Sequence, residues 1–200
     1  MRRGVLYLTA AVLCAASPAI AGLATTWRAA IHPDDRIRLL ALWPAWTTAK
    51  AAAVDHGKTA DWVALGPLAD PAPSADGMWP AAGAYRCRLV KLGARLPGRP
   101  DIAATRDFPC AMTNDGGIIG FTVRGAFQAS SGRLYPDGER MVFLGALTLR
   151  GDMSPFAYGA DPDRNQVGVL ERIGPARWRL ALPWPRFEST IDVVDIVPAS

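Results

Sequence analysis

The sequence predicts a mainly β protein with an N-terminal helical arm, in which about eight antiparallel strands form a lipocalin-like barrel or a strongly bent sandwich. Residues 83–200 hold short apolar or alternating segments separated by turns rich in Gly, Pro, Asn and Asp. No helical period lies between these segments, which argues against a parallel sheet with crossover helices. Residues 22–65, in contrast, carry apolar side chains at helical spacing.

Residues 1–21 have the three parts of a secretory signal peptide. Arg2 and Arg3 give a positive start, an apolar run of about a dozen residues is too short to cross a bilayer as a helix, and the segment ends in the small-x-small pattern AIA. We expect cleavage between Ala21 and Gly22 and export of the protein to the periplasm or out of the cell. The mature chain, residues 22–200, has no apolar run long enough for a transmembrane helix.

Residues 22–65 are predicted to form the helical arm, and residues 66–82, rich in Pro and Gly, a connector to the β-domain. Pro44 lies inside the periodic region, where it removes a helical hydrogen bond, so we expect a kink or break near Leu42–Trp43. The apolar stripe is expected to pack on the β-domain. It includes Leu39, Trp43, Trp46 and Ala53, and Trp27 and Trp62 extend the aromatic cluster.

The β-domain is predicted to begin with the strand at residues 83–93. Tyr85, Cys87 and Leu89 share one face in an extended chain, and the intervening arginines wet the other face. A loop rich in Gly and Pro then leads back to Cys110. A Cys87–Cys110 disulfide would close a loop of about 24 residues and stabilise the fold by roughly 3 kcal/mol. Two buried free thiols are the alternative, and export favours the disulfide.

Turn residues divide the rest of the β-domain into further strands. We expect these at residues 119–128, with a bulge at Gly125, and at residues 134–135, 141–150, 167–173, 178–184 and 190–197. The segment 141–150 is apolar on both faces, so it should be covered on both sides. In the segment 178–184, Trp178, Leu180, Leu182 and Trp184 should share one face. An eight-stranded barrel is either filled by its own side chains or holds one small ligand.

Few residues are suited to catalysis. Both histidines, His32 and His56, lie in the arm, and the nucleophile-elbow, zinc-protease and phosphate-loop motifs are absent. We predict no catalytic residues, no cofactor and no metal. Four acids around one loop keep a carboxylate hydrolase as an alternative: Asp152, Asp161, Asp163 and Glu171.

The same loop opens with the oxygen spacing of a calcium site at Asp161, Asp163 and Asn165. However, Gln166 stands where such a loop needs Gly, and Arg172 stands where it needs Glu. We therefore expect a solvated loop with local side-chain caps.

The charge of the chain is weakly positive, which argues against nucleic-acid binding. The formal net charge of +4 falls by two when Arg2 and Arg3 leave with the signal peptide. Five basic residues on predicted strands could line a rim for an acidic ligand, although a solvent-facing side of a sheet is the simpler reading. They are Arg86, Arg88, Lys91, Arg177 and Arg179. Candidate ligand-lining residues, with core packing as the alternative, are Tyr85, Phe143, Trp178, Leu180 and Trp184.

Several motifs together resemble a bacterial exported family of unknown function, DUF4893. They are Asp34, Arg36, Leu39 and Trp46 at their spacing in the arm, GAYRCRLVKLGA, RMVFLGAL, and VLERIGPARWRLALPWP. The resemblance covers most of the mature chain and implies no known activity. The start Gly83-Ala84-Tyr85 is similar, more loosely, to that of lipocalin-like barrels, and exported protease-inhibitor barrels with one disulfide also look similar.

Three functional hypotheses follow from these observations. The first is a non-catalytic periplasmic β-barrel module that binds a small molecule or a protein. The second is a carboxylate hydrolase of an envelope polymer. The third is a structural envelope protein that contacts its neighbours through the arm. The sequence names neither ligand nor partner.

Overall fold

The computed structural model describes residues 26–72, 79–115, 118–125, 128–152 and 154–199, and the predicted signal peptide with its cleavage site at Ala21–Gly22 lies outside them. The helices are α1 (Trp27–Ala30), α2 (Pro33–Leu40), α3 (Leu42–Asp55), α4 (Thr59–Ala64) and the short 3-10 helix η1 (Gly66–Leu68). The strands are β1 (Gly83–Ala94), β2 (Ile102–Ala104), β3 (Phe108–Asp115), β4 (Ile118–Val123), β5 (Gln128–Asp137), β6 (Arg140–Leu149), β7 (Asn165–Gly174), β8 (Arg177–Pro183) and β9 (Ser189–Pro198).

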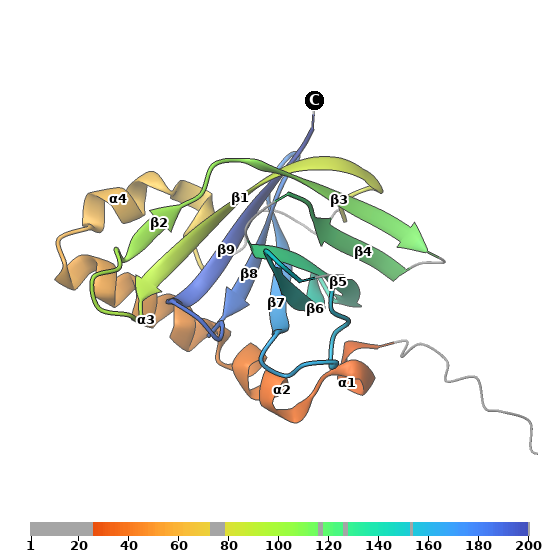
Figure 1. The fold of residues 1–200 in the computed structure, drawn as a ribbon. Coiled ribbons are helices and arrows are strands. Elements are labelled where there is room, and N and C mark those ends of the chain that lie inside the picture. The colour runs from red at the N-terminus through yellow and green to blue at the C-terminus, as the bar shows by residue number, and fades with distance from the viewer. Residues whose placement is uncertain (1–25, 73–78, 116–117, 126–127, 153, 200) are drawn as a thin grey trace, which may run out of the picture.

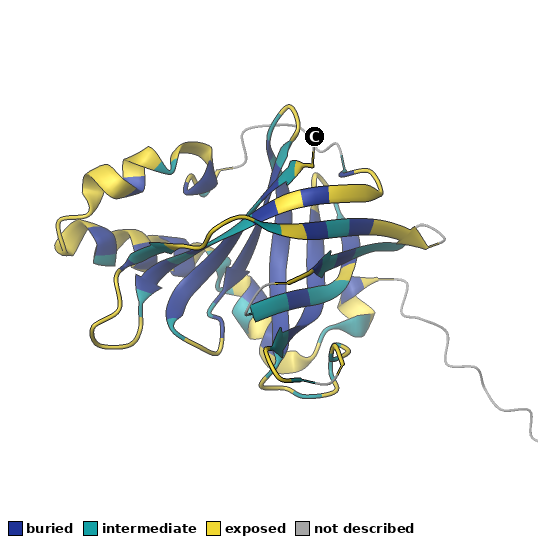
Figure 2. Cartoon of the chain, turned by 45° about the horizontal axis from the view of Figure 1, so that its top comes forward, coloured by how far each residue is buried: buried dark blue, intermediate teal, exposed yellow. Residues whose placement is uncertain are grey.

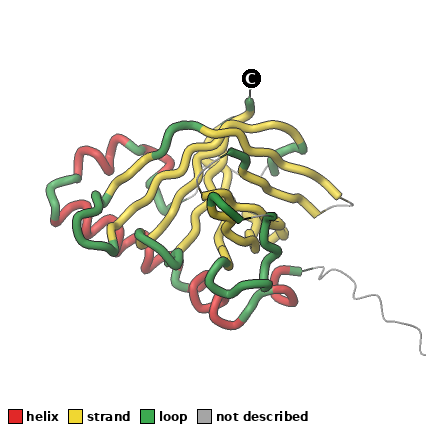
Figure 3. Tube along the Cα trace, viewed as in Figure 1, coloured by secondary structure: helices red, strands yellow, loops and turns green. Residues whose placement is uncertain are grey.

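The strands form one antiparallel sheet that closes on itself (Figures 1 and 3). From β3 to β9 each strand pairs with the next one in sequence, and β3 pairs with the first half of β1. β1 also pairs with β9, from Tyr85 opposite Pro198 to Ala94 opposite Ser189. This last pairing joins the two ends of the sheet into an eight-stranded barrel and confirms the predicted antiparallel barrel. β2, which we expected to be loop, adds three residues to the edge of β1.

The predicted disulfide between β1 and β3 is present. Cys87 and Cys110 are bonded, with their Cα atoms 5.9 Å apart, and both are buried inside the barrel. Tyr85 lies opposite Cys110 in the register of the two strands. The alternation of β1 therefore places the sulfur atoms on the inner face, as the sequence predicted.

β5 is longer than the two-residue strand that we expected. It runs from Gln128 to Asp137 because β4 and β6 pair with it on its two sides. Gly132 and Gly145 face each other in this pairing, and the ring of Phe143 covers both. Glycine lowers strand propensity, so the local sequence does not indicate a strand here, although pairing with β4 and β6 stabilises one.

The helices cover part of the outer face of the barrel, as Figures 1 and 2 show for α3. α3 contacts β1, β8 and β9, and α2 contacts β7 and β8. Beneath them the outward positions of the strands are apolar and almost fully buried: Val90, Leu92, Ile173, Ala181, Ile191 and Val193. The outward apolar residues of β1 and β9 are thus explained by a helix that shields them from water.

The expected helix break occurs one residue before Leu42. Ala41 separates α2 from α3, and Pro44 falls in the first turn of α3, where its missing N–H costs no intrahelical hydrogen bond. Because α3 starts as a separate helix, its apolar residues do not continue the buried face of α2 at the expected spacing. Trp46 is 2% exposed against the sheet, whereas Trp43 is 62% exposed. The prediction that Trp43 packs on the β-domain was therefore wrong.

Two apolar residues of α2 precede Trp43 at intervals of three residues and are also exposed. Ile37 is 67% exposed and Leu40 is 72% exposed. Trp27 and Trp62, in contrast, are buried. The helical segment therefore has a row of apolar side chains that the described residues do not cover.

Arg179 attaches the start of the predicted connector to the outer face of the barrel. Its buried guanidinium forms an ion pair with Glu171, with Nη2 2.8 Å from Oε2, and donates to backbone carbonyls of residues 67, 70 and 71. The ring of Trp46 lies 5.1 Å away. Arg179 therefore has a structural role on the outside of the barrel.

Candidate functional site

One end of the barrel, which we call the closed end, is filled by apolar side chains. Here β1 begins and β9 ends. Tyr85 and Trp178 pack edge to face with ring centroids 6.0 Å apart, and Phe121 and Phe143 do so at 5.9 Å. Leu180 is fully buried in the same cluster. Within the described part of the chain, these side chains pack against one another and line none of the three pockets at the opposite end.

At the opposite end, which we call the mouth, the inward positions become polar. Here β1, β6 and β8 end and β5, β7 and β9 begin. Lys91 follows Cys87 and Leu89 on the inner face of β1, and Asp192 precedes Val194 on the inner face of β9. The register places Lys91 directly opposite Asp192. The barrel thus has an apolar interior at one end and a charged interior at the other.

Lys91 and Asp192 form the floor of the mouth. Lys91 Nζ lies 3.2 Å from Asp192 Oδ2 and 3.4 Å from Glu188 Oε2. The hydroxyl of Ser189 also hydrogen-bonds to the Asp192 carboxylate. Burial raises the pKa of Asp192 above its ordinary value, while the ammonium of Lys91 acts in the opposite direction.

Gln166 lies on the inner face of β7 in the same pocket. Its residue is 8% exposed, and its Oε1 atom has no hydrogen-bond partner among the described residues. Leaving a buried amide oxygen unpaired costs about 1–3 kcal/mol. The other such atom, Nη1 of Arg164, is within 3.4 Å of the Asp152 carboxylate. Gln166 is therefore the position where an added hydrogen-bond donor would stabilise the fold most directly.

Three adjoining pockets open at the mouth, and Gln128 lines all of them. The innermost, bounded by Lys91, Gln166 and Asp192, has a volume of about 20 Å³, and the outer two have about 350 Å³ and 550 Å³. The first is enough for one water molecule, and the outer two are in the range of small-molecule sites.

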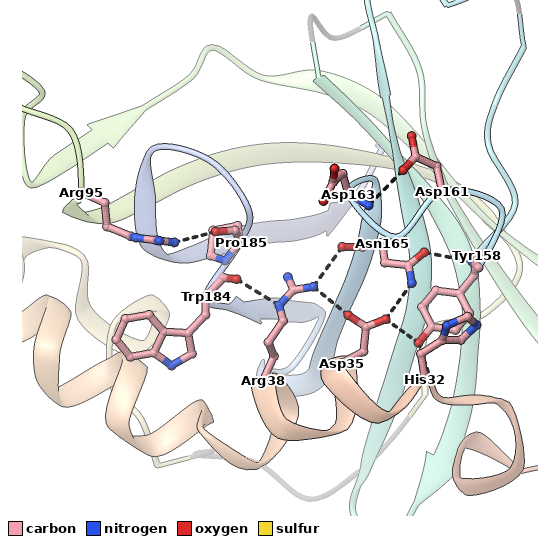
Figure 4. Close-up of polar contacts among 11 residues, drawn as sticks. His32, Asp35, Arg38, Arg95, Tyr158, Asp161, Asp163, Asn165, Trp184 and Pro185 are labelled. Carbon is pink, nitrogen blue, oxygen red and sulfur yellow. Dashed lines mark hydrogen bonds and ion pairs between the residues drawn. The ribbon is translucent and has the colours of Figure 1, made fainter.

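The turn between β8 and β9 forms one wall of the mouth. Trp184 and Glu188 have φ angles of 48° and 63°, in the left-handed region that residues other than glycine rarely adopt. Two arginines hold the turn (Figure 4): Arg95 Nη1 donates to the Pro185 carbonyl at 2.8 Å, and Arg38 Nε donates to the Trp184 carbonyl at 3.0 Å. Such strained backbone persists where its surroundings fix it, and it is frequent at functional sites.

A buried polar network attaches α2 to β7 beside the mouth (Figure 4). The Asp35 carboxylate, 1% exposed, accepts hydrogen bonds from Arg38 at 2.9 Å, Tyr158 at 2.7 Å and Asn165 at 2.8 Å. Burial raises the pKa of the Tyr158 hydroxyl, so it remains protonated and can donate. Since Asn165 precedes Gln166, this network positions the strand that carries Gln166.

The predicted ligand-lining residues divide into two groups. Tyr85, Phe143, Trp178 and Leu180 lie together in the packed closed end. Trp184 lies apart from them, after the end of β8, where its indole N–H donates to the Ala41 carbonyl at 3.1 Å. The expected common face ends at Leu182 because the positive φ of Trp184 reverses the alternation. The residues that line the mouth are different ones.

Two acids of the hydrolase hypothesis, Asp152 and Asp161, pair with the same arginine, Arg164, at 3.4 Å and 4.0 Å. Asp152 accepts a hydrogen bond from the backbone of Leu149 at 2.7 Å, and Glu171 is paired with Arg179 on the outside of the barrel. Asp163 lines the innermost pocket of the mouth. Glu171 therefore lies apart from the three acids of the loop, which are near Arg164.

The calcium-like loop forms local caps, as expected for a solvated loop. Asp161 accepts a hydrogen bond from the backbone N–H of Asp163 at 3.0 Å, and Asn165 turns towards Asp35. Among the described residues, no group of three or more His, Cys, Asp and Glu side chains is placed to hold a metal ion.

Three of the basic residues considered for a rim, Arg86, Arg88 and Arg177, line one pocket of about 320 Å³ outside the barrel, together with Asp107 and Asp195. Arg88 and Arg177 form ion pairs with Asp195 on the outer face, and Arg86 pairs with Asp107. Lys91 points into the mouth.

Sequence reasoning missed Asp192, Gln166, Arg95 and Arg186 as site residues. One signal was available for Asp192: it shares the inner face with Val194 and Ile196, and a charge at the end of an apolar face indicates a special environment. Gln166 had a similar signal, since it shares a face with Leu170. The two arginines lie on turns, where no periodicity indicates direction.

Comparison with protein families bears on the whole fold. A family model described as a domain of unknown function (DUF4893) matches residues 27–196, from the first helix to the last strand. The chain belongs to this family. The match spans both the helices and the barrel of this DUF4893 protein. No curated protein and no solved structure is significantly similar to it. Within the described residues, none of the helices has the length and apolar character needed to cross a membrane.

Proposed function

We propose that this DUF4893 protein is an exported, non-catalytic binding module that holds a small molecule in the mouth of its barrel. The observation that carries the proposal is the unpaired, buried Oε1 of Gln166 beneath an open pocket, in a barrel that is packed at its other end. The export signal in the sequence and the disulfide support a location outside the cytoplasm.

Catalysis is not required to explain the mouth. Lys91 is neutralised by two carboxylates, and Ser189 donates to a carboxylate. In a binding site these charges fix orientation, while the apolar walls provide affinity. A rigid barrel with one open end is suited to this task because little ordering is needed on binding.

Native mass spectrometry of the protein purified from its own periplasm tests the proposal. We expect a co-purifying small mass that is lost from Gln128→Trp, because Gln128 borders all three pockets and a larger side chain obstructs them. Arg140→Gln, at the far end of β6, is the matched control and should retain the mass. A mass that persists in Gln128→Trp, or a fold with no bound mass in any preparation, contradicts the proposal.

A second candidate is contact with an envelope protein through the helices. It is favoured by the exposed row of Ile37, Leu40 and Trp43. Site-specific photocrosslinking from position 43 in intact cells should then yield one defined adduct, and its absence counts against this candidate.

A further inference from the structure

We propose that the ligand of the mouth is a small amphipathic organic acid, with its acidic group between Arg95 and Arg186 and its apolar body against Phe187, Leu96 and Leu149. This inference rests on the proposed function and specifies the chemical class of the ligand. The residues concerned line the outer pocket of about 350 Å³.

Two guanidinium groups in this pocket lack a carboxylate partner. Arg95 donates to the Pro185 carbonyl, and Arg186 makes no hydrogen bond or ion pair with any residue that the structure describes. The one acid of the pocket, Glu188, is already paired with Lys91 at 3.4 Å and with Arg99 at 3.5 Å. The pocket therefore has positive charge that no carboxylate of the described residues compensates.

A third arginine lies close to Arg186, so positive charges are near one another at the mouth. Arg38 and Arg186 both line the innermost pocket. Burial lowers the pKa of Arg38, and the nearby charge of Arg186 lowers it further, although Asp35 opposes both effects. An anion at Arg186 would relieve this repulsion, and guanidinium groups bind carboxylate and phosphate oxygens well.

The apolar part of the proposed site consists of two exposed side chains outside the helices. Among the described residues, the large apolar side chains that are exposed lie in α2, α3 and α4, with two exceptions: Leu96 is 49% exposed and Phe187 is 45% exposed. Both line the same pocket as the two arginines. Exposed apolar side chains that gather beside unpaired cations indicate a ligand that has both an apolar body and an acidic group.

The test uses sodium octanoate, the uncharged analogue 1-octanol and inorganic phosphate as probes of the purified protein. Binding is followed by amide chemical-shift changes in NMR spectra. We expect octanoate to shift the amides of residues 95–96 and 186–188 and to bind about tenfold more tightly than octanol or phosphate. Its affinity should fall as salt is added, because exposed charges are screened.

Single substitutions connect the binding to the two arginines. Arg186→Gln should weaken octanoate binding about three- to tenfold and leave octanol binding unchanged. Arg95→Gln should weaken octanoate binding at least as much, and because Arg95 also holds the turn through the Pro185 carbonyl, it should weaken octanol binding as well. Arg140→Gln, another exposed arginine, should bind octanoate as the wild type does. Both mouth arginines are exposed, so the variants should fold.

The outcomes separate the two proposals. Equal binding of octanoate and octanol at the mouth overturns the preference for an acid but supports small-molecule binding there. The proposal that the ligand is an acid is also overturned if octanoate fails to bind, or if it binds Arg186→Gln and Arg95→Gln as tightly as the wild type. In each case the proposed function is still judged by its own mass-spectrometric experiment.

Discussion

Asp192 is the most deeply buried charged group of the mouth. Its neighbours are the ammonium of Lys91, the carboxylate of Glu188 and the hydroxyl of Ser189. Burial raises its pKa above the ordinary 3.8, so the folded chain holds this proton more tightly than the unfolded chain does. The contribution of Asp192 to the free energy of unfolding is therefore fully present below that value, and it is lost as the pH rises through the higher pKa of the folded state.

Asp192→Asn removes this titration. The stability of the variant relative to the wild type should therefore increase from about pH 4 to about pH 7. Urea unfolding at both pH values measures the difference. Gln128→Ala, an uncharged change in the same mouth, is the control and should show a pH-independent difference. A relative stability of Asp192→Asn that falls with pH would show that the pair with Lys91 outweighs burial.

At the scale of elements, α3 lies close to the sheet because small residues meet at the contact. Ala45, Ala49 and Ala53 recur every four residues on the buried side of the helix. They face β1, where a Cβ atom on Gly93 would lie 2.9 Å from Ala49 Cα and 2.9 Å from Thr190 Oγ1. Gly93 also has a φ of 68°. The position therefore requires glycine for both space and backbone conformation.

Gly93→Ala should lower the free energy of unfolding by about 1–2 kcal/mol for the positive φ and by a further 1–3 kcal/mol, approximately, for overpacking. Gly98→Ala is the matched control. Gly98 has a φ of 75° and nothing within 4 Å of its Cβ position, so only the backbone cost applies. Thermal and chemical unfolding compare the two variants. Equal losses would contradict the close contact.

A third prediction concerns the stability that Arg179 provides by joining a loop to the sheet. Arg179→Ala leaves the buried Glu171 unpaired and should cost about 3–5 kcal/mol. The double variant Arg179→Met, Glu171→Leu should recover much of that stability, since no buried charge remains. Chemical denaturation measures both. A single variant as stable as the double variant would contradict the role of the ion pair.

The elements could be predicted from sequence where one physical signal dominates. The alternation in β1 gave both the strand and the inward direction of Cys87, and Pro44 gave the break between α2 and α3. Most of β5 was not predicted because Gly132 lowers the strand propensity of a segment that is stabilised by pairing on both sides. Trp43 was misplaced because the break changes the helical phase. The mouth was missed because Lys91 and Asp192 are about a hundred residues apart and meet only through barrel closure.

For the whole molecule, the helices and the barrel share one apolar interface. The outward side chains of β1, β8 and β9 beneath α3 are buried, among them Val90, Ala181 and Ile191, each at 0% exposure. The division into a helical arm at 22–65, a connector at 66–82 and a β-domain at 83–200 remains a prediction. The interface indicates that these parts depend on each other for stability.

Residues 79–200 expressed alone should therefore not remain a folded monomer. The exposed apolar face of the barrel should cause aggregation, which size-exclusion chromatography and circular dichroism detect. Residues 22–200 serve as the comparison. A monomeric, cooperatively unfolding 79–200 fragment would show that the barrel is an independent domain.

The pairing of Tyr85 with Pro198 places the end of β9 at the closed end of the barrel, away from the mouth (Figure 1). A linker fused after residue 200 therefore offers a way to immobilise the protein on a biosensor chip with its opening directed towards the flowing buffer. Analytes could then reach Phe187 and Arg186 without interference from the solid support.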